Sequence, residues 1–145
     1  MKKQLHIISL LFLVFFLIGC DTFIISPLIP SITSNLHIAA GNGGYMVSFY
    51  SIFYVIFTFV LGPLSDRIGR KPMIIIGIVV FSISSLITGI AGNFPIILIA
   101  RGVTGVGAAF AAPNIWAFIG DYFDQSIRGK VTAAVASALS LGLVI

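Results

Sequence analysis

Residues 62–72 read GPLSDRIGRKP, a dense group of charges between two long uncharged stretches. No Asp, Glu, Lys or Arg occurs from Thr22 to Ser65 or from Pro72 to Ala100. An ionised side chain at the centre of a bilayer costs about 2.5–3.5 kcal/mol even on the mildest insertion scale. We therefore expect this charged segment (residues 62–72) to form a loop in water that fixes the ends of the apolar segments beside it.

The composition indicates an integral membrane protein rather than a soluble domain. Of 145 residues, 59% are hydrophobic and only 8% are charged, whereas a soluble domain carries about 25% charged residues. The net charge of +4 does not indicate nucleic-acid binding, because the basic residues flank apolar segments and are not interleaved with aromatic ones. The single cysteine and two distant histidines favour neither a disulfide nor a metal site. No nucleophile constellation or phosphate-binding loop indicates an enzyme.

The apolar stretches predict an all-α membrane protein with four complete transmembrane helices and a truncated fifth. Pro27 and Pro30 are expected to bend or end the first helix. Residues 31–44 are expected to form a loop, and residues 121–130 form a second charged loop. The fifth stretch falls short of the roughly 20 residues that a span requires. The expected spans in this single partial domain, residues 1–145, are 5–28, 45–62, 73–91, 95–120 and 131–145.

The basic residues predict the orientation of the chain. Cytoplasmic ends of transmembrane helices are enriched in Lys and Arg. We therefore expect a multi-pass protein of the plasma membrane with a cytoplasmic N-terminus. All Lys and Arg residues outside the spans fall on that one side: Lys2, Lys3, Arg67, Arg70, Lys71, Arg128 and Lys130.

Two charged residues, Asp21 and Arg101, remain inside the expected spans. From the helix rise, Asp21 lies about 10 Å and Arg101 about 9 Å below the outer face. Opposite charges at matching depth are expected to pair, because pairing reduces the cost of burying each. A carboxylate placed there can take up a proton in dry surroundings and release it in wet ones. The alternatives are a static ion pair that fixes helix packing, or an Asp21 side chain that reaches water.

Small residues follow Arg101 at helical spacing and indicate a closely packed interior helix. They include Gly102, Gly105 and Gly107, and the fifth stretch has a similar pattern that contains Gly142.

The charged segment resembles the signature loop between helices two and three of the major facilitator superfamily. Residues 97–109 resemble the fourth-helix motif of that family, although Thr104 stands where a glutamine is often found. Residues 21–30 are similar to the first helix of the bacterial drug:proton antiporter branch, and residues 142–145 fit the start of an antiporter motif on helix five. The matching positions in the charged segment are Gly62, Asp66, Arg67, Gly69, Arg70 and Lys71.

This resemblance implies part of the N-terminal half of a bundle built from two six-helix halves around a cavity. It implies a secondary transporter that uses a proton gradient and no cofactor, with Asp21, Arg101 and Thr104 in proton or substrate coupling. Its partners would be the lipid bilayer, a small-molecule substrate in the full-length relative, and the C-terminal half that this chain lacks. We expect the chain to be inactive alone, because it cannot enclose a pathway.

The two charged loops are expected to meet on the cytoplasmic side as half of a gate. We expect Asp66 to contact Arg128, and Arg67 or Arg70 to contact Asp121 or Asp124. The family resemblance implies that Asp66 and its neighbours also contact the second half of the transporter and stabilise the outward-open state.

Efflux of drugs or small metabolites is the favoured function. Uptake of a sugar or another metabolite is the alternative within transporters, and a small non-transporting membrane protein is the alternative outside them.

Overall fold

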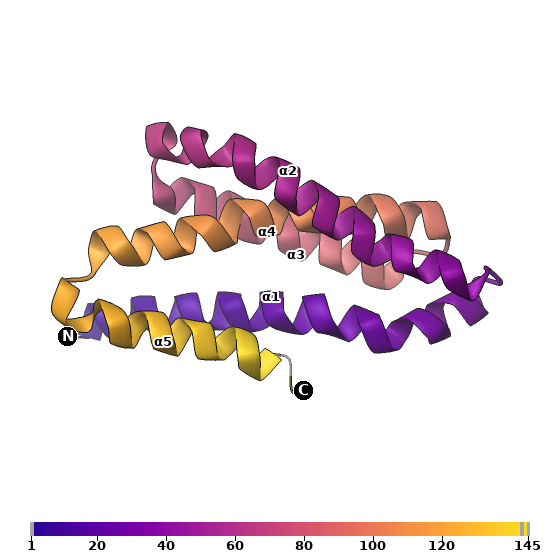
Figure 1. The fold of residues 1–145 in the computed structure, drawn as a ribbon, viewed down its shortest axis with the longest axis horizontal. Helices are drawn as coiled ribbons and strands as arrows, with labels where there is room; N and C mark the ends of the chain where they lie inside the picture. The colour runs from indigo at the N-terminus through magenta and orange to yellow at the C-terminus, as the bar shows by residue number, and fades with distance from the viewer. Residues whose placement is uncertain (1, 143, 145) are drawn as a thin grey trace.

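The computed structural model describes residues 2–142 and residue 144, with the side chains of residues 2 and 3 left out. The described residues form long helices joined by short connections (Figure 1). Four segments are long and apolar enough to cross a membrane: Gln4–Asn35, Ala40–Ile68, Arg70–Ile90 and Phe94–Tyr122. The elements are α1 (Lys2–Asn35), the 3-10 helix η1 (Ala40–Gly43), α2 (Gly44–Ile68), α3 (Arg70–Ile90), α4 (Phe94–Tyr122) and α5 (Gln125–Gly142).

Helix α1 is longer than the sequence predicts, because it continues through Pro27 and Pro30 to Asn35. A proline inside a helix leaves a carbonyl without its backbone donor. Transmembrane helices tolerate this where hydroxyl side chains and neighbouring helices supply other hydrogen bonds. The expected end of the helix near residue 28 is therefore wrong.

The charged segment is helical rather than a loop. Residues 62–68 form the last turns of α2 and residues 70–72 the first turn of α3, so that only Gly69 interrupts the helices. The second expected loop, residues 121–130, is also mostly helical and breaks at Phe123 and Asp124. Charged residues flank both breaks, and hydropathy alone does not reveal that the segments around them are helical.

Helix α4 is the interior helix, and α2 and α3 pack on it through glycines. A Cβ atom at Gly105 would collide with the carbonyl of Tyr50 on α2. A Cβ at Gly107 would lie 2.5 Å from the backbone nitrogen of Phe81 on α3, and one at Gly77 would lie 2.6 Å from the nitrogen of Ala111. Glycine at these positions lets the helix backbones approach closely, as the sequence predicts for Gly105 and Gly107.

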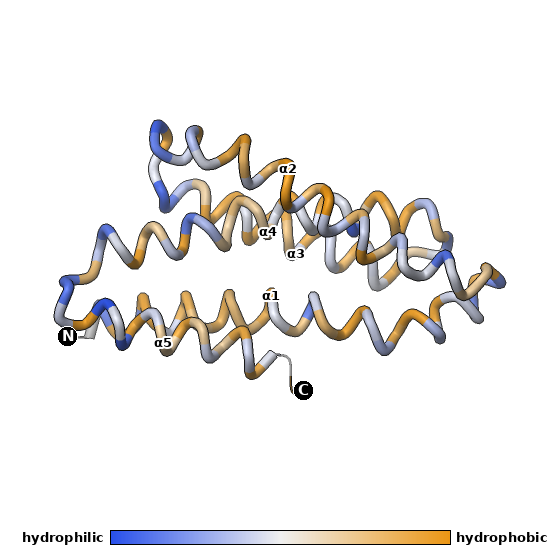
Figure 2. The backbone as a smooth tube through the Cα atoms, in the orientation of Figure 1, coloured by the Kyte–Doolittle hydropathy of each residue, from blue (hydrophilic) through white to orange (hydrophobic). Residues whose placement is uncertain are grey.

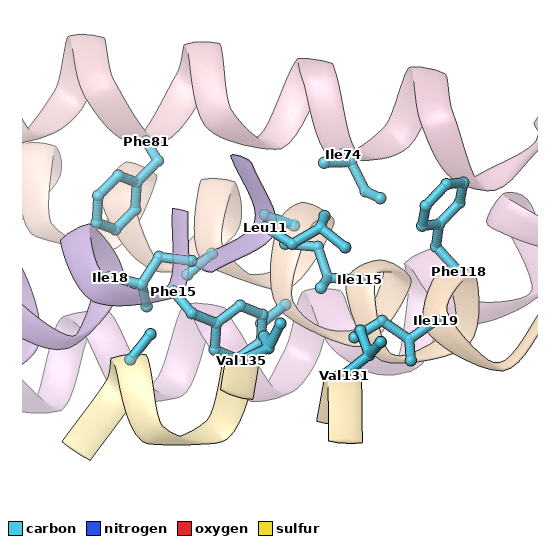
Figure 3. Packing of buried hydrophobic residues seen from close by; sticks show 14 of the residues in the cluster. Leu11, Phe15, Ile18, Ile74, Phe81, Ile115, Phe118, Ile119, Val131 and Val135 are labelled. Carbon is cyan, nitrogen blue, oxygen red and sulfur yellow. The ribbon is translucent and has the colours of Figure 1, made fainter. Parts of the chain in front are cut away.

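Helices α1 and α5 form a second packed pair (Figure 1). A Cβ at Gly142 would lie 2.7 Å from the nitrogen of Cys20, and one at Gly19 would lie 2.8 Å from the carbonyl oxygen of Leu139. The remaining positions of the helix-five resemblance, residues 143 and 145, lie outside the described residues. Figure 3 shows where the α1/α5 pair meets α3 and α4, in a buried cluster that includes Phe15, Ile115 and Val135.

The surface and the two ends of the bundle have the polarity of a membrane protein. Large apolar side chains such as Phe59, Ile90 and Ile99 are exposed, which suits lipid rather than water. Figure 2 shows hydrophilic residues gathered at the ends of the helices. The N-terminus and the α2–α3 and α4–α5 connections lie at the same end (Figure 1), so the basic segments counted in the sequence share one side.

Candidate functional site

The pair expected from the sequence is present inside the bundle. Nη1 of Arg101 on α4 lies 2.7 Å from Oδ2 of Asp21 on α1, and these side chains are only 2% and 12% exposed. A buried charge that lost its partner would be strongly destabilising, commonly by about 3–5 kcal/mol. The pair therefore ties α1 to α4 inside the bundle.

Helices α2 and α3 each add a side chain to this pair. Oγ of Ser85 donates a hydrogen bond of 2.5 Å to Oδ1 of Asp21. The guanidinium of Arg101 lies over the ring of Tyr50, 4.8 Å from its centroid, where the ring face attracts a cation. All four long helices thus meet at one polar cluster.

Thr104 is not brought into this cluster, although the sequence placed it with the coupling residues. It is fully buried, and its hydroxyl donates to the carbonyl of Ala100 in its own helix. Gly102, also on α4, faces the ring of Phe53 at contact distance. Within the described part of the chain, Nε of Arg101 is a buried donor without a hydrogen-bond partner.

A groove of about 610 Å³ runs between α1 and α3 and reaches the pair. Most of its lining is apolar, and its polar groups include Asp21, Ser82 and Ser85. The one cysteine of the chain, Cys20, also lines it.

A second cluster lies at the end of the bundle that carries the charged segment, and Arg70 is its centre. The Arg70 guanidinium contacts Oγ of Ser65 at 2.6 Å, Oδ1 of Asp66 at 2.7 Å and Oδ2 of Asp121 at 3.4 Å. The predicted contact between Arg70 and Asp121 is therefore present, and it joins the start of α3 to the end of α4.

The predicted contact between Asp66 and Arg128 is wrong, because Asp66 pairs with Arg70 instead. Asp66 lies in the last turn of α2 and Arg70 is the first residue of α3, so the break at Gly69 brings the two side chains together. Arg128 donates to the carbonyl of Phe123 and so closes the end of α4. Among the described residues, the ion pairs found do not include Arg67, Lys71 or Asp124.

Gly69 and Ser65 shape this second cluster. Gly69 has φ 102° and ψ 152°, a backbone conformation that is essentially restricted to glycine, and it allows α2 to end where α3 begins. The buried Ser65 hydroxyl donates to the carbonyl of Gly62 while it accepts from Arg70. A Cβ at Gly62 itself would meet nothing within 4 Å, so its place in the motif has no packing reason here.

Sequence reasoning missed Ser65, Tyr50 and Ser85. Serine and tyrosine are frequent in these helices, and nothing in the spacing of hydroxyl side chains distinguishes the ones that reach a charge. Their partners lie on other helices, so that only the packing identifies them.

Comparison with known proteins identifies the family of the chain. The family model described as Major Facilitator Superfamily matches residues 11–145. The chain belongs to the major facilitator superfamily. It is 41% identical over 140 residues to the uncharacterized MFS-type transporter YceJ of Bacillus subtilis (strain 168), covering 94% of this chain and 36% of that relative.

Two further relatives of this chain are named for drug resistance. Multidrug resistance protein 1 of Bacillus subtilis (strain 168) is 35% identical over 147 residues, covering 99% of this chain and 37% of the relative. Quinolone resistance protein NorA of Staphylococcus aureus is 24% identical over 146 residues, covering 100% of this chain and 37% of the relative. The chain thus spans little more than a third of the transporters it matches, and it corresponds to part of a multi-pass membrane protein.

Proposed function

We propose that this chain is the N-terminal part of a proton-coupled transporter that exports drugs or small metabolites. The observation that carries the proposal is the buried pair of Asp21 and Arg101, at which side chains from all four long helices meet. A charged pair inside a membrane bundle is expensive and is a functional candidate by default. The relatives named for drug resistance support the direction and class of transport.

In this proposal Asp21 exchanges a proton as its surroundings alternate between wet and dry. With Asp21 ionised, its charge is neutralised by Arg101 and the cluster is closed. A proton on the Asp21 carboxyl group leaves Arg101 as an unpaired cation, which favours rearrangement of the helices that hold it. Release of that proton to the opposite side restores the pair. The proposed activity is transport without an enzymatic step.

We place the Arg70 cluster and the N-terminus on the cytoplasmic side of the plasma membrane. The location of the basic segments at one end of the bundle supports this orientation. Asp66 and Asp121 remain 64% and 66% exposed while they share Arg70, so both can exchange partners. In the complete transporter the partner would be the C-terminal half, and the cluster would act as half of a cytoplasmic gate.

The test uses a full-length chimera in which this chain replaces the matching third of multidrug resistance protein 1. Efflux of a fluorescent quinolone and of cationic dyes is measured in inverted vesicles, with and without a pH gradient. Asp21→Asn should abolish gradient-driven transport, and Asp124→Asn, at a carboxylate outside the ion pairs described above, should not. Gradient-driven transport that survives Asp21→Asn would refute the coupling role, and accumulation in the opposite direction would favour uptake.

A further inference from the structure

Ser85 departs from the hydrogen bonding of other hydroxyl side chains on α3. Ser84 donates to the carbonyl of Val80, and Thr88 donates to the carbonyl of Ser84. This bond to the preceding turn is the usual one for Ser and Thr inside a helix. Ser85 instead donates across the groove to Asp21 on α1. Its hydroxyl therefore gives up the local bond for one with a charge, which is typically about twice as strong as a bond between neutral groups.

The bond from Ser85 also completes the coordination of the carboxylate. Arg101 holds Oδ2 and Ser85 holds Oδ1, so that the two oxygens of Asp21 are bound from two different helices. The terminal torsion of an aspartate is broad and roughly two-fold, and one partner alone leaves the carboxylate free to turn about it. A second donor on the other oxygen removes that freedom.

This bond also joins α1 directly to α3, and each of these helices has another helix as its main packing partner. Helix α1 packs mainly on α5, whereas α3 packs mainly on α4. Between α1 and α3 lies the apolar groove of about 610 Å³, and Ser85 and Asp21 both line it. The hydrogen bond therefore spans the groove at the position of the charged pair.

We propose that Ser85 is a positioning residue for the Asp21–Arg101 pair. Its hydroxyl holds the ionised carboxylate of Asp21 toward Arg101 and keeps α1 close to α3. Protonation of Asp21 removes the charge that strengthens this bond. Protonation therefore both frees Arg101 and weakens the link between α1 and α3 across the groove. The meaning of this inference for transport rests on the proposed function, whereas the bond itself can be tested on the chain alone.

The matched variants are Ser85→Thr, which keeps the hydroxyl, and Ser85→Val, whose side chain has the shape of threonine but no hydroxyl. Ser82 lines the same groove on the same helix, so Ser82→Thr and Ser82→Val are the control pair. The full chain is reconstituted in lipid nanodiscs, and its natural single cysteine, Cys20, reports on the groove through its rate of alkylation by a maleimide. Circular dichroism checks that each variant is folded, and Ser85→Ala replaces Ser85→Val where the larger side chain does not fit.

We expect Cys20 to react roughly tenfold faster in Ser85→Val than in Ser85→Thr, because a hydrogen bond to a charged group is lost. The Ser82 pair should show equal rates. The difference between Thr and Val at residue 85 should disappear in an Asp21→Leu background, which leaves no acceptor at residue 21, since the two residues act as one unit. Equal rates for the Ser85 pair, or a difference that persists without Asp21, would overturn the inference.

Infrared spectroscopy provides a second readout that packing alone would not change. The carboxylate stretch of Asp21, isolated by subtracting the spectrum of Asp21→Asn, should shift in Ser85→Val and stay unchanged in Ser85→Thr. An unshifted band in Ser85→Val would also contradict the inference. Failure of the proposed function has a different signature: Asp21→Asn would leave gradient-driven transport by the chimera intact, whereas the Ser85 effects on Cys20 and on the band would remain.

Discussion

Gly107 on α4 and Gly77 on α3 pack backbone against backbone, with the carbonyl oxygen of Gly107 2.8 Å from the place where a Cβ of Gly77 would lie. Neither position has room for a side chain. This contact fixes the distance between the two helices, and it therefore also fixes how far Ser85 on α3 stands from Arg101 on α4.

Gly107→Ala should destabilise the bundle by about 1–3 kcal/mol, because the added methyl group meets the backbone of Phe81 and the helices must separate. Gly120→Ala is the matched control on the same helix, where a Cβ meets nothing within 4 Å. Because alanine forms helices better than glycine, this control should be neutral or stabilising. Thermal unfolding in detergent measures both, and equal melting temperatures would contradict the close approach.

The buried pair should behave as a unit when its members are removed. Arg101→Met leaves the Asp21 carboxylate without its charge partner and should cost about 3–5 kcal/mol. The double variant Asp21→Asn/Arg101→Met has no buried charge and should recover a large part of that loss. Unfolding titrations with a denaturing detergent compare the two. If the double variant is no more stable than Arg101→Met, the cost does not come from an isolated charge.

Gly69→Ala should disturb the Arg70 cluster by forcing a side chain into a conformation that favours glycine. Gly69 has φ 102° and ψ 152°, and an alanine held in that conformation would carry about 1–3 kcal/mol of backbone strain. We expect faster trypsin cleavage after Arg67 and Arg70, because the local structure opens more often. Gly62→Ala, seven residues earlier along the chain and in open space, is the control. Equal cleavage rates in the two variants would argue against strain at Gly69.

The orientation can be tested with single cysteines in a Cys20→Ser background. Lys71→Cys lies at the end of the bundle with the basic segments, and Gly92→Cys lies in the exposed connection between α3 and α4. A membrane-impermeant maleimide added to intact cells should label Gly92→Cys at once and Lys71→Cys only after permeabilisation. The reverse pattern of labelling would place the N-terminus outside.

Hydropathy and charge were sufficient to predict much of the fold. Long uncharged stretches require helices in lipid, since every backbone polar group must be satisfied within the segment. The expected helix ends were less accurate, because α1 continues to Asn35 and α2 to Ile68 through residues that are less apolar than the centres of the helices. The contact of Asp66 with Arg70 was missed because it depends on where α2 ends and α3 begins, at Gly69.

The sequence by itself determined the membrane class, the order of the long helices and the pairing of Asp21 with Arg101. These follow from the cost of charge in lipid and from helix rise, which act on one segment at a time. Only the tertiary structure decided that Ser85 and Tyr50 complete the pair, that Thr104 does not, and that Arg70 is the centre of the second cluster. Those choices depend on the rotation of each helix about its axis, which packing against neighbouring helices sets.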